Sequence, residues 1–303
     1  MIIGHEKQWD FLKRQLQNLR VPHAFLFSGE GKLGKRKVAF EFLKLLNCQN
    51  SDFSEKPCQV CQSCRALEKG VHPDFFLIKP EKTGIGISQI RQLTKSLSLK
   101  PYFQWKTAVI DQACLMTAQA QNCLLKTLEE PSGKTCLILI SEHPSLLFQT
   151  ILSRVQEIKF FPVRKEKILD YLINQGIKKS EAQEIVELSS GRPGQAIEFL
   201  SNPEKLNEYK SRIKEFLLAF KGNLAQRFHY AKVLTAENEN LKEVFDIWLN
   251  HLRQSMISKI KKKDFEDVLK IKKILEEIAE IQSLISQSNI NKRLALETLF
   301  LKI

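Results

Sequence analysis

Residues 23–35 read His-Ala-Phe-Leu-Phe-Ser-Gly-Glu-Gly-Lys-Leu-Gly-Lys, and this stretch decides the fold. Its first part is a short, continuous apolar run, as in a buried parallel strand, and it leads directly into glycines. Apolar residues then recur at helical spacing from Ala39 to Leu46. A strand, a glycine-rich loop and a helix in this order are the context of a Walker A phosphate-binding loop.

The loop supplies Gly29, Gly31, Gly34 and Lys35 as candidate nucleotide-binding residues. Backbone N–H groups of such a loop surround phosphates, and its lysine reaches the terminal ones. The next position should offer a Ser or Thr hydroxyl to Mg²⁺, but it is Arg36. A glycine-rich turn without a ligand is one interpretation. A vestigial or non-hydrolysing loop that holds ATP or ADP is favoured, because strand, loop and helix agree.

A second apolar strand ends at Asp111, the position of an acidic Mg²⁺ ligand. The residue after it should be a glutamate that polarises the attacking water, but here it is Gln112. A neutral amide cannot act as a base. Arg36 and Gln112 are therefore two independent defects, and we expect no ATP hydrolysis by this chain even if a nucleotide binds.

Strand and helix patterns alternate in the first half of the chain, which predicts an α/β P-loop domain with a parallel sheet. Further strands are expected at 75–78, 107–111 and 136–141, and helices at 6–19, 88–98 and 117–130. Downstream of residue 162 the strand signals stop and helical patterns remain. The predicted domains are an α/β domain at 1–162, a small helical lid domain at 163–203 and an all-α collar domain at 204–303.

Cys48, Cys58, Cys61 and Cys64 form a C-x9-C-x2-C-x2-C pattern inside a polar stretch. Four thiolates that reach one point make a closed tetrahedral site, so the pattern predicts a structural Zn²⁺ module at 48–64. Four unrelated thiols explain the two successive Cys-x2-Cys steps poorly. A redox motif of thioredoxin type would lie at a strand-to-helix junction, which this stretch does not.

The chain has 47 Lys and Arg against 34 Asp and Glu, a formal net charge of +13. This excess gives weak support for contact with a polyanion. The densest basic run, Lys259 and residues 261–263, is interpreted as a solvated interhelical loop. No apolar run is long enough to span a bilayer, and residues 1–6 do not begin a secretory signal, so a cytoplasmic protein without membrane contact is expected.

These landmarks resemble the clamp-loader subunits of bacterial DNA polymerase III, which are AAA+ proteins, and among them the delta-prime type more than the gamma/tau type. The resemblance covers nearly the whole chain. It rests on the entry into the phosphate loop, the cysteine insertion, the helix after the second strand motif, a Ser-Arg motif, a Gly-Arg-Pro-Gly motif and the last helix. Apart from the cysteines, these motifs occupy residues 23–29, 120–131, 150–154, 191–196 and 289–299.

The resemblance implies roles for three further residues. Arg154 matches an arginine finger that acts in trans at a neighbouring subunit's ATP site, although Val155 replaces the cysteine that ends the family motif. Ser141 matches a sensor position loosely. Arg192 matches the second sensor, while a helix start with Pro and flanking glycines explains it equally well. In the last helix, Leu294, Leu301 and their neighbours are expected to be packing residues.

The resemblance also implies a function: a delta-prime-type scaffold that assembles with gamma/tau and delta subunits and helps load the sliding clamp onto primer-template DNA during replication. It would be a component of the polymerase holoenzyme without polymerase chemistry of its own. One alternative is a catalytically active gamma/tau-type ATPase, which would turn over Mg-ATP alone. Another is a free-standing zinc-dependent DNA-binding module, which would bind DNA tightly without partners.

Overall fold

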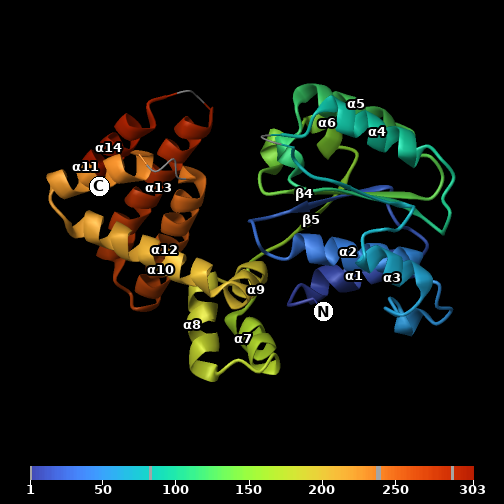
Figure 1. The fold of residues 1–303 in the computed structure, drawn as a ribbon, viewed down its shortest axis with the longest axis horizontal. Helices are drawn as coiled ribbons and strands as arrows, with labels where there is room; N and C mark the ends of the chain where they lie inside the picture. The colour runs from blue at the N-terminus through green and yellow to red at the C-terminus, as the bar shows by residue number, and fades with distance from the viewer. Residues whose placement is uncertain (1, 82–83, 237–239, 288–289) are drawn as a thin grey trace. The chain divides into compact units, whose positions relative to one another are not determined.

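The computed structural model describes residues 2–81, 84–236, 240–287 and 290–303. The chain forms two compact units, Met1–Gln195 and Ala196–Ile303. The first unit contains a parallel sheet and the second is helical (Figure 1). The prediction of three domains, divided after residues 162 and 203, remains a prediction.

The sheet has five strands in the order β2-β3-β4-β1-β5, and every neighbouring pair is parallel. The carboxyl ends of all five strands therefore lie on the same side of the sheet, which is called its carboxyl edge below. The strands are β1 Ala24–Ser28, β2 Phe75–Ile78, β3 Lys106–Ile110, β4 Thr135–Ser141 and β5 Gln156–Lys159. The four strands expected from the sequence are confirmed to within one residue at either end, whereas β5 was missed.

Helices cover both faces of the sheet, because successive strand residues point to opposite sides. Phe25 and Phe27 pack into one apolar cluster with α1 and α2, while Ala24 and Leu26 pack into another with α4, α5 and α6. Figure 1 shows α3 on the same side as α1 and α2. These helices are α1 Glu6–Gln17, α2 Lys35–Asn47, α3 Gln62–Glu68, α4 Ile87–Leu97, α5 Ala118–Glu129 and α6 Gln149–Leu152. Short 3-10 turns are Phe53–Glu55, Ala113–Leu115 and Pro144–Leu146.

Three helices follow the sheet. They are α7 Lys165–Asn174, α8 Lys179–Ser189 and α9 Pro193–Ser201, the last of which crosses the boundary between the units. Gly191 joins this region to the end of the sheet domain, because its carbonyl accepts a hydrogen bond from Val163 N at 2.7 Å. Its φ of 76° lies in the left-handed region, and a Cβ there would come within 2.7 Å of the Val163 carbonyl, so glycine is required.

The second unit is built around Trp248, which is fully buried. Its ring stacks on Phe216 at a centroid distance of 4.7 Å and lies 6.0 Å from the rings of Tyr230 and Phe300. These aromatic residues come from four different helices, so the indole of Trp248 packs against three other helices of the bundle. The helices are α10 Pro203–Lys221, α11 Leu224–Ala236, α12 Leu241–Lys261, α13 Phe265–Gln287 and α14 Lys292–Lys302.

The expectation that the basic run is a solvated interhelical loop is correct for part of it, because Lys262 and Lys263 are exposed and lie in the turn between α12 and α13. Lys259 is instead in α12, which continues to Lys261, and it pairs with Asp264 at 2.9 Å and also with Asp267. The expectation that Leu294, Leu301 and their neighbours are packing residues holds within this chain for the neighbours, whereas Leu294 and Leu301 themselves are 61% and 60% exposed. The residues of α14 that are buried are Ala295, Leu296, Leu299 and Phe300. Asn289, where the quoted C-terminal motif begins, lies outside the described residues.

Candidate functional site

The glycine-rich loop connects β1 to α2 at the carboxyl edge of the sheet. Gly29 and Gly34 have φ angles of 137° and 92°, which non-glycine residues rarely adopt. The Gly29 N–H donates to the carbonyl of Ser141 at 3.2 Å, and a Cβ on Gly29 would collide with the carbonyl of Phe160. The local sequence thus forms a tight loop that opens a helix, as the pattern predicted.

Lys35 lies within this loop and is only 5% exposed. Its ammonium donates to the carbonyls of Gly29 at 2.6 Å and of Glu30. Burial lowers the pKa of Lys35, and the carboxylates of Glu142 and Asp111 partly oppose that effect. The lysine therefore has acceptors inside the loop, and a phosphate would have to compete with them.

Arg36 and Asp111, the two positions of a magnesium site, contact each other instead. Arg36 Nη1 lies 3.6 Å from Asp111 Oδ2, and the N–H of Gln112 donates to Asp111 Oδ1 at 3.1 Å. Both carboxylate oxygens thus have partners, while Arg36 offers no oxygen to a metal. Gln112 is exposed. These residues do not fit the Mg²⁺ ion that a P-loop ATPase requires.

Two other segments of the first unit hold the loop. His5 Nε2 donates to the carbonyl of Leu33 at 2.8 Å, and the N–H of Gly194 donates to the carbonyl of Lys32 at 2.8 Å. A Cβ on Gly194 would lie 2.7 Å from that same carbonyl oxygen, so only glycine permits the approach. Burial lowers the pKa of His5, which keeps its ring neutral at physiological pH. The start of α9 therefore lies directly on the phosphate loop.

The two predicted sensor residues make local contacts. Ser141 is fully buried beside Ser28 in the β1–β4 register, and its hydroxyl accepts from the N–H of His143 at 3.2 Å. Arg192 is also buried, and its Nε donates to the carbonyl of Ser189 at 3.2 Å. Ser141 thus lies at the loop's edge of the sheet, and Arg192 lies two residues before Gly194. Their roles toward a nucleotide remain predictions.

Arg154 lies at the opposite side of the sheet, near the amino ends of the strands. It comes two residues before β5, and β5 runs parallel to β1, whose far end carries the phosphate loop. The guanidinium donates to the carbonyl of Thr150 at 2.9 Å and pairs with Glu129 at 2.9 Å, at the end of α5. Its side chain is 36% exposed. Arg154 is therefore held at the surface, separated from its own loop by the length of a strand.

The four cysteines predicted to bind zinc come together, with all their sulfur atoms within 4.8 Å of one another. Cys48 and Cys64 are buried, and the N–H of Cys58 donates to the sulfur of Cys48 at 3.4 Å. Donation from the N–H groups of Cys61 and Val60 lowers the pKa of the Cys58 thiol to about 6. Tetrahedral ligation with Zn–S bonds of about 2.3 Å needs sulfurs roughly 3.8 Å apart. The cluster fits a structural zinc ion.

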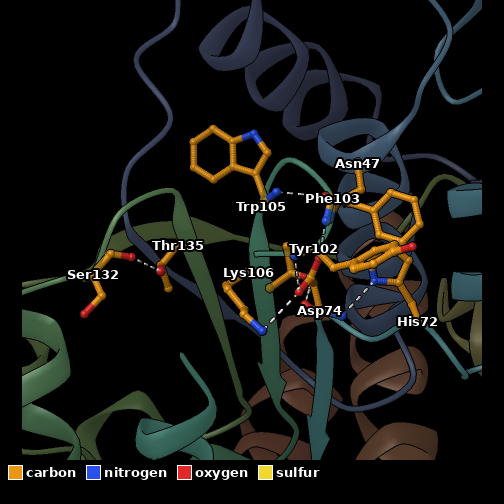
Figure 2. A network of polar contacts seen from close by, with 10 residues as sticks. Asn47, His72, Asp74, Tyr102, Phe103, Trp105, Lys106, Ser132 and Thr135 are labelled. Carbon is orange, nitrogen blue, oxygen red and sulfur yellow. Dashed lines mark hydrogen bonds and ion pairs between the residues drawn. The ribbon is translucent and has the colours of Figure 1, made fainter. Parts of the chain in front are cut away.

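A buried polar network beside this module was not foreseen (Figure 2). Asp74 is 1% exposed, accepts from the backbone N–H groups of Tyr102 and Phe103 at 3.0 and 2.6 Å, and pairs with Lys106 at 3.0 Å. The ring of His72 lies 4.6 Å from that of Phe103. Asp74 and Lys106 flank two adjacent parallel strands, and this opposite-charge pair was the sequence signal that could have indicated the network.

The parallel sheet, the Walker A loop after β1 and the acidic residue after β3 define an AAA+-type P-loop domain, here with a degenerate metal position. A family model described as "DNA polymerase III, delta subunit" matches residues 4–164, more than half of the 303-residue chain. The chain belongs to this DNA polymerase III subunit family, and it is similar to proteins named DNA polymerase III subunit delta-prime.

Among curated relatives, DNA polymerase III subunit delta-prime of Bacillus subtilis is 34% identical over 194 residues, covering 64% of this chain and 58% of that protein. Subunit delta-prime of Pseudomonas aeruginosa is 38% identical over 135 residues, covering 44% of this chain and 41% of that protein. The chain therefore spans about half the length of the curated relatives it matches.

A solved structure of a DNA polymerase III gamma subunit-related protein from Thermotoga maritima covers 97% of both chains, with a TM-score of 0.54 and 19% identity. At that identity the likeness establishes the fold alone. Within the described residues, no helix combines the length and the apolar character needed to cross a membrane.

Proposed function

We propose that the chain is a delta-prime-type scaffold of the replicative clamp loader. It assembles with gamma/tau and delta subunits, lends Arg154 to the ATP site of a neighbour, and helps place the sliding clamp on primer-template DNA in the cytoplasm. Family membership and the similarity to delta-prime and tau subunits support this role.

The position of Arg154 is the main support for the proposal, because it separates the residue from its own loop and leaves the guanidinium at the surface. A guanidinium spreads the charge that develops on a transferring phosphoryl group, so it is useful only where a nucleotide is bound. At the amino edge of the sheet that nucleotide would belong to another subunit. Glu129 would keep the side chain extended until the neighbour's phosphate competes for it.

The active gamma/tau-type ATPase is the alternative, and the metal position argues against it. Arg36 replaces the hydroxyl ligand and contacts Asp111, and Gln112 replaces the base. An ATPase needs the metal to offset phosphate charge and a residue to orient water. We therefore assign no hydrolysis to this chain and a structural role to its zinc module.

The decisive comparison is between Arg154→Ala and Lys35→Ala in reconstituted complexes with gamma/tau and delta. Losing a finger costs about 10³- to 10⁵-fold at the site it serves. Because one of several sites is affected, DNA-stimulated ATPase should fall partially with Arg154→Ala, and clamp loading should fall further. Lys35→Ala should leave most of the complex's hydrolysis intact. Steady-state ATPase and clamp loading are measured after gel filtration confirms equal assembly.

Arg20→Ala is the matched control, because Arg20 is exposed and lies in the turn before β1. It should behave as wild type in both assays. If Lys35→Ala is damaging and Arg154→Ala silent, the proposed division of labour is reversed. Turnover of Mg-ATP by the isolated chain, abolished by Lys35→Ala, would favour the active ATPase.

A further inference from the structure

The phosphate loop contains a cation of its own where an ATPase places magnesium. We propose that the Arg36 guanidinium substitutes for Mg²⁺ in this loop, so that the loop takes a nucleoside diphosphate or triphosphate in its metal-free form. This goes beyond the scaffold role and is independent of Arg154.

Arg36 is positioned to act this way. It directly follows Lys35 in the first turn of α2, and its guanidinium lies 3.6 Å from Asp111 Oδ2 and 5.6 Å from the ring of Phe40. Phe40 in turn packs against Phe75 at 5.1 Å between ring centroids. The carboxylate and the ring together hold the planar group beside the loop, whereas a lysine would not stack in this way.

A guanidinium suits a phosphate without metal. It presents several N–H donors in a planar fork, which matches two phosphate oxygens, and it remains charged at any physiological pH. The Arg36 side chain is 45% exposed, so it can turn from Asp111 to a ligand without entering a closed core. Together with Lys35 it would provide two positive charges next to the N-terminus of α2.

The same arrangement opposes magnesium. Mg²⁺ demands close to octahedral oxygen ligands, and the oxygens of Asp111 are already engaged: one is ion-paired with Arg36 at 3.6 Å and the other accepts from the Gln112 N–H. A divalent ion on a nucleotide would also approach the guanidinium and be repelled. The metal complex should therefore bind less tightly than the free nucleotide.

Glu142 should lower the affinity of the loop for a nucleotide's phosphates. A Cβ on Gly31 would lie 2.8 Å from Glu142 Oε1, so this carboxylate lies against the loop, and its charge acts on Lys35. It opposes an incoming phosphate by like-charge repulsion. Removing its charge with Glu142→Gln should strengthen metal-free binding and leave the discrimination against magnesium unchanged.

The test is a calorimetric titration of the full isolated chain with ADP and with ATP, made once in EDTA and once in excess Mg²⁺. Thermal unfolding with each nucleotide in the same two buffers gives a second measure of binding. Wild type should bind at least threefold more tightly in EDTA. Arg36→Thr restores a hydroxyl and frees Asp111, so its preference should reverse toward Mg²⁺. Arg36→Gln keeps a polar hydrogen-bonding group but removes the positive charge, and it should lose the metal-free preference.

Lys37→Thr is the matched control, because it removes the next cation of the same helix, which pairs with Glu41 at 3.1 Å. It should retain the EDTA preference. A magnesium requirement in wild type, equal affinity in both buffers, or no binding in either would overturn the proposal. So would an Arg36→Thr variant that still prefers EDTA. None of these outcomes concerns partner subunits, so failure here leaves the Arg154 proposal intact.

Discussion

Asp74 and Lys106 form an ion pair whose side chains are both almost completely buried, at 1% and 8% exposed. Burying two charges is costly, and it is tolerated only when both are paired and hydrogen-bonded. Asp74 meets this condition through the N–H groups of Tyr102 and Phe103. Burial alone would raise the pKa of Asp74, but these N–H groups and the Lys106 ammonium outweigh it and hold the pKa below its ordinary value.

Asp74→Asn should therefore destabilise the first unit strongly. The amide leaves the Lys106 ammonium buried without a counter-charge, a change that costs about 3–5 kcal/mol. Urea unfolding at neutral pH measures the loss. Glu187→Gln is the control, because its exposed pair with Lys165 should contribute at most about 1 kcal/mol.

The same pair predicts the direction of a pH effect. A carboxyl whose folded pKa is lowered contributes stability above its unfolded pKa, about 3.9, and this contribution disappears as pH falls through the folded pKa. The deficit of Asp74→Asn relative to wild type should thus shrink below about pH 4. A deficit that stays constant from pH 7 to pH 3 would show that Asp74 acts through packing and not through its charge.

Single residues were predictable where spacing defines them. The loop lysine, the acidic residue and the arginine of the Ser-Arg motif were found from motifs. The structure places Lys35 first in α2, Asp111 directly after β3, and Arg154 between α6 and β5. The contact of Arg36 with Asp111 was not predictable, because the two residues meet only when β3 lies in the same sheet as β1. The Asp74 network was missed for a similar reason, because Asp74 and Lys106 come together only when β2 and β3 are neighbours in the sheet.

Among the elements, the zinc module gives the clearest test. The purified chain should contain about one Zn²⁺, and Cys61→Ser should lower that content because a tetrahedral site loses a ligand. Cys61 also caps α3 by accepting from the N–H of Cys64 at 3.4 Å. Hydrogen exchange should therefore rise in residues 48–68 before it rises in the phosphate loop. Metal analysis and exchange mass spectrometry measure both.

Cys114→Ser is the matched control, since Cys114 lies outside the cluster. It should keep the full zinc content. Unchanged zinc in Cys61→Ser would show that this ligand set is wrong, and faster exchange centred on residues 29–35 would show that the module supports the loop directly.

Elements with strong patterns were predicted well and weak ones were not. Three of the four expected strands, β1, β3 and β4, are buried throughout, as parallel strands should be, and the edge strand β2 is an apolar run that is partly buried. The β5 strand reads Gln-Glu-Ile-Lys and lies at the sheet edge, with Ile158 its one buried residue, so it carries too little apolar signal. Lys259 was assigned to the loop that follows α12 because a run of lysines resembles a loop, although acidic residues following Lys259 pair with it.

At the scale of the whole molecule, alternating strands and helices followed by helices alone predicted the class of both units. The division between them was harder, because α9 crosses the boundary without a break. Periodicity reports which face of a helix is apolar and does not report which neighbour covers that face. Leu294 and Leu301 show this limit: their apolar character was recognised, but both side chains are largely exposed.

These two leucines lead to a prediction about assembly. A spacing of seven residues places Leu294 and Leu301 on one stripe of α14, while Leu296 and Phe300 fill the core on another. If the helical unit is the collar of the proposed complex, the exposed stripe should face another subunit. Leu294→Glu with Leu301→Glu should leave the stability of the isolated chain within about 0.5 kcal/mol, as expected for surface changes.

The same double change should abolish or sharply weaken assembly with gamma/tau and delta, because burying two carboxylates at an apolar interface is costly. Gel filtration of the mixed subunits and thermal unfolding of the single chain measure the two effects. Leu19→Glu is the control, since Leu19 is 89% exposed in the first unit, and it should assemble normally. Normal assembly of the double variant would place the partner surface elsewhere on the chain. A large loss of stability would instead mean that the stripe supports the bundle itself.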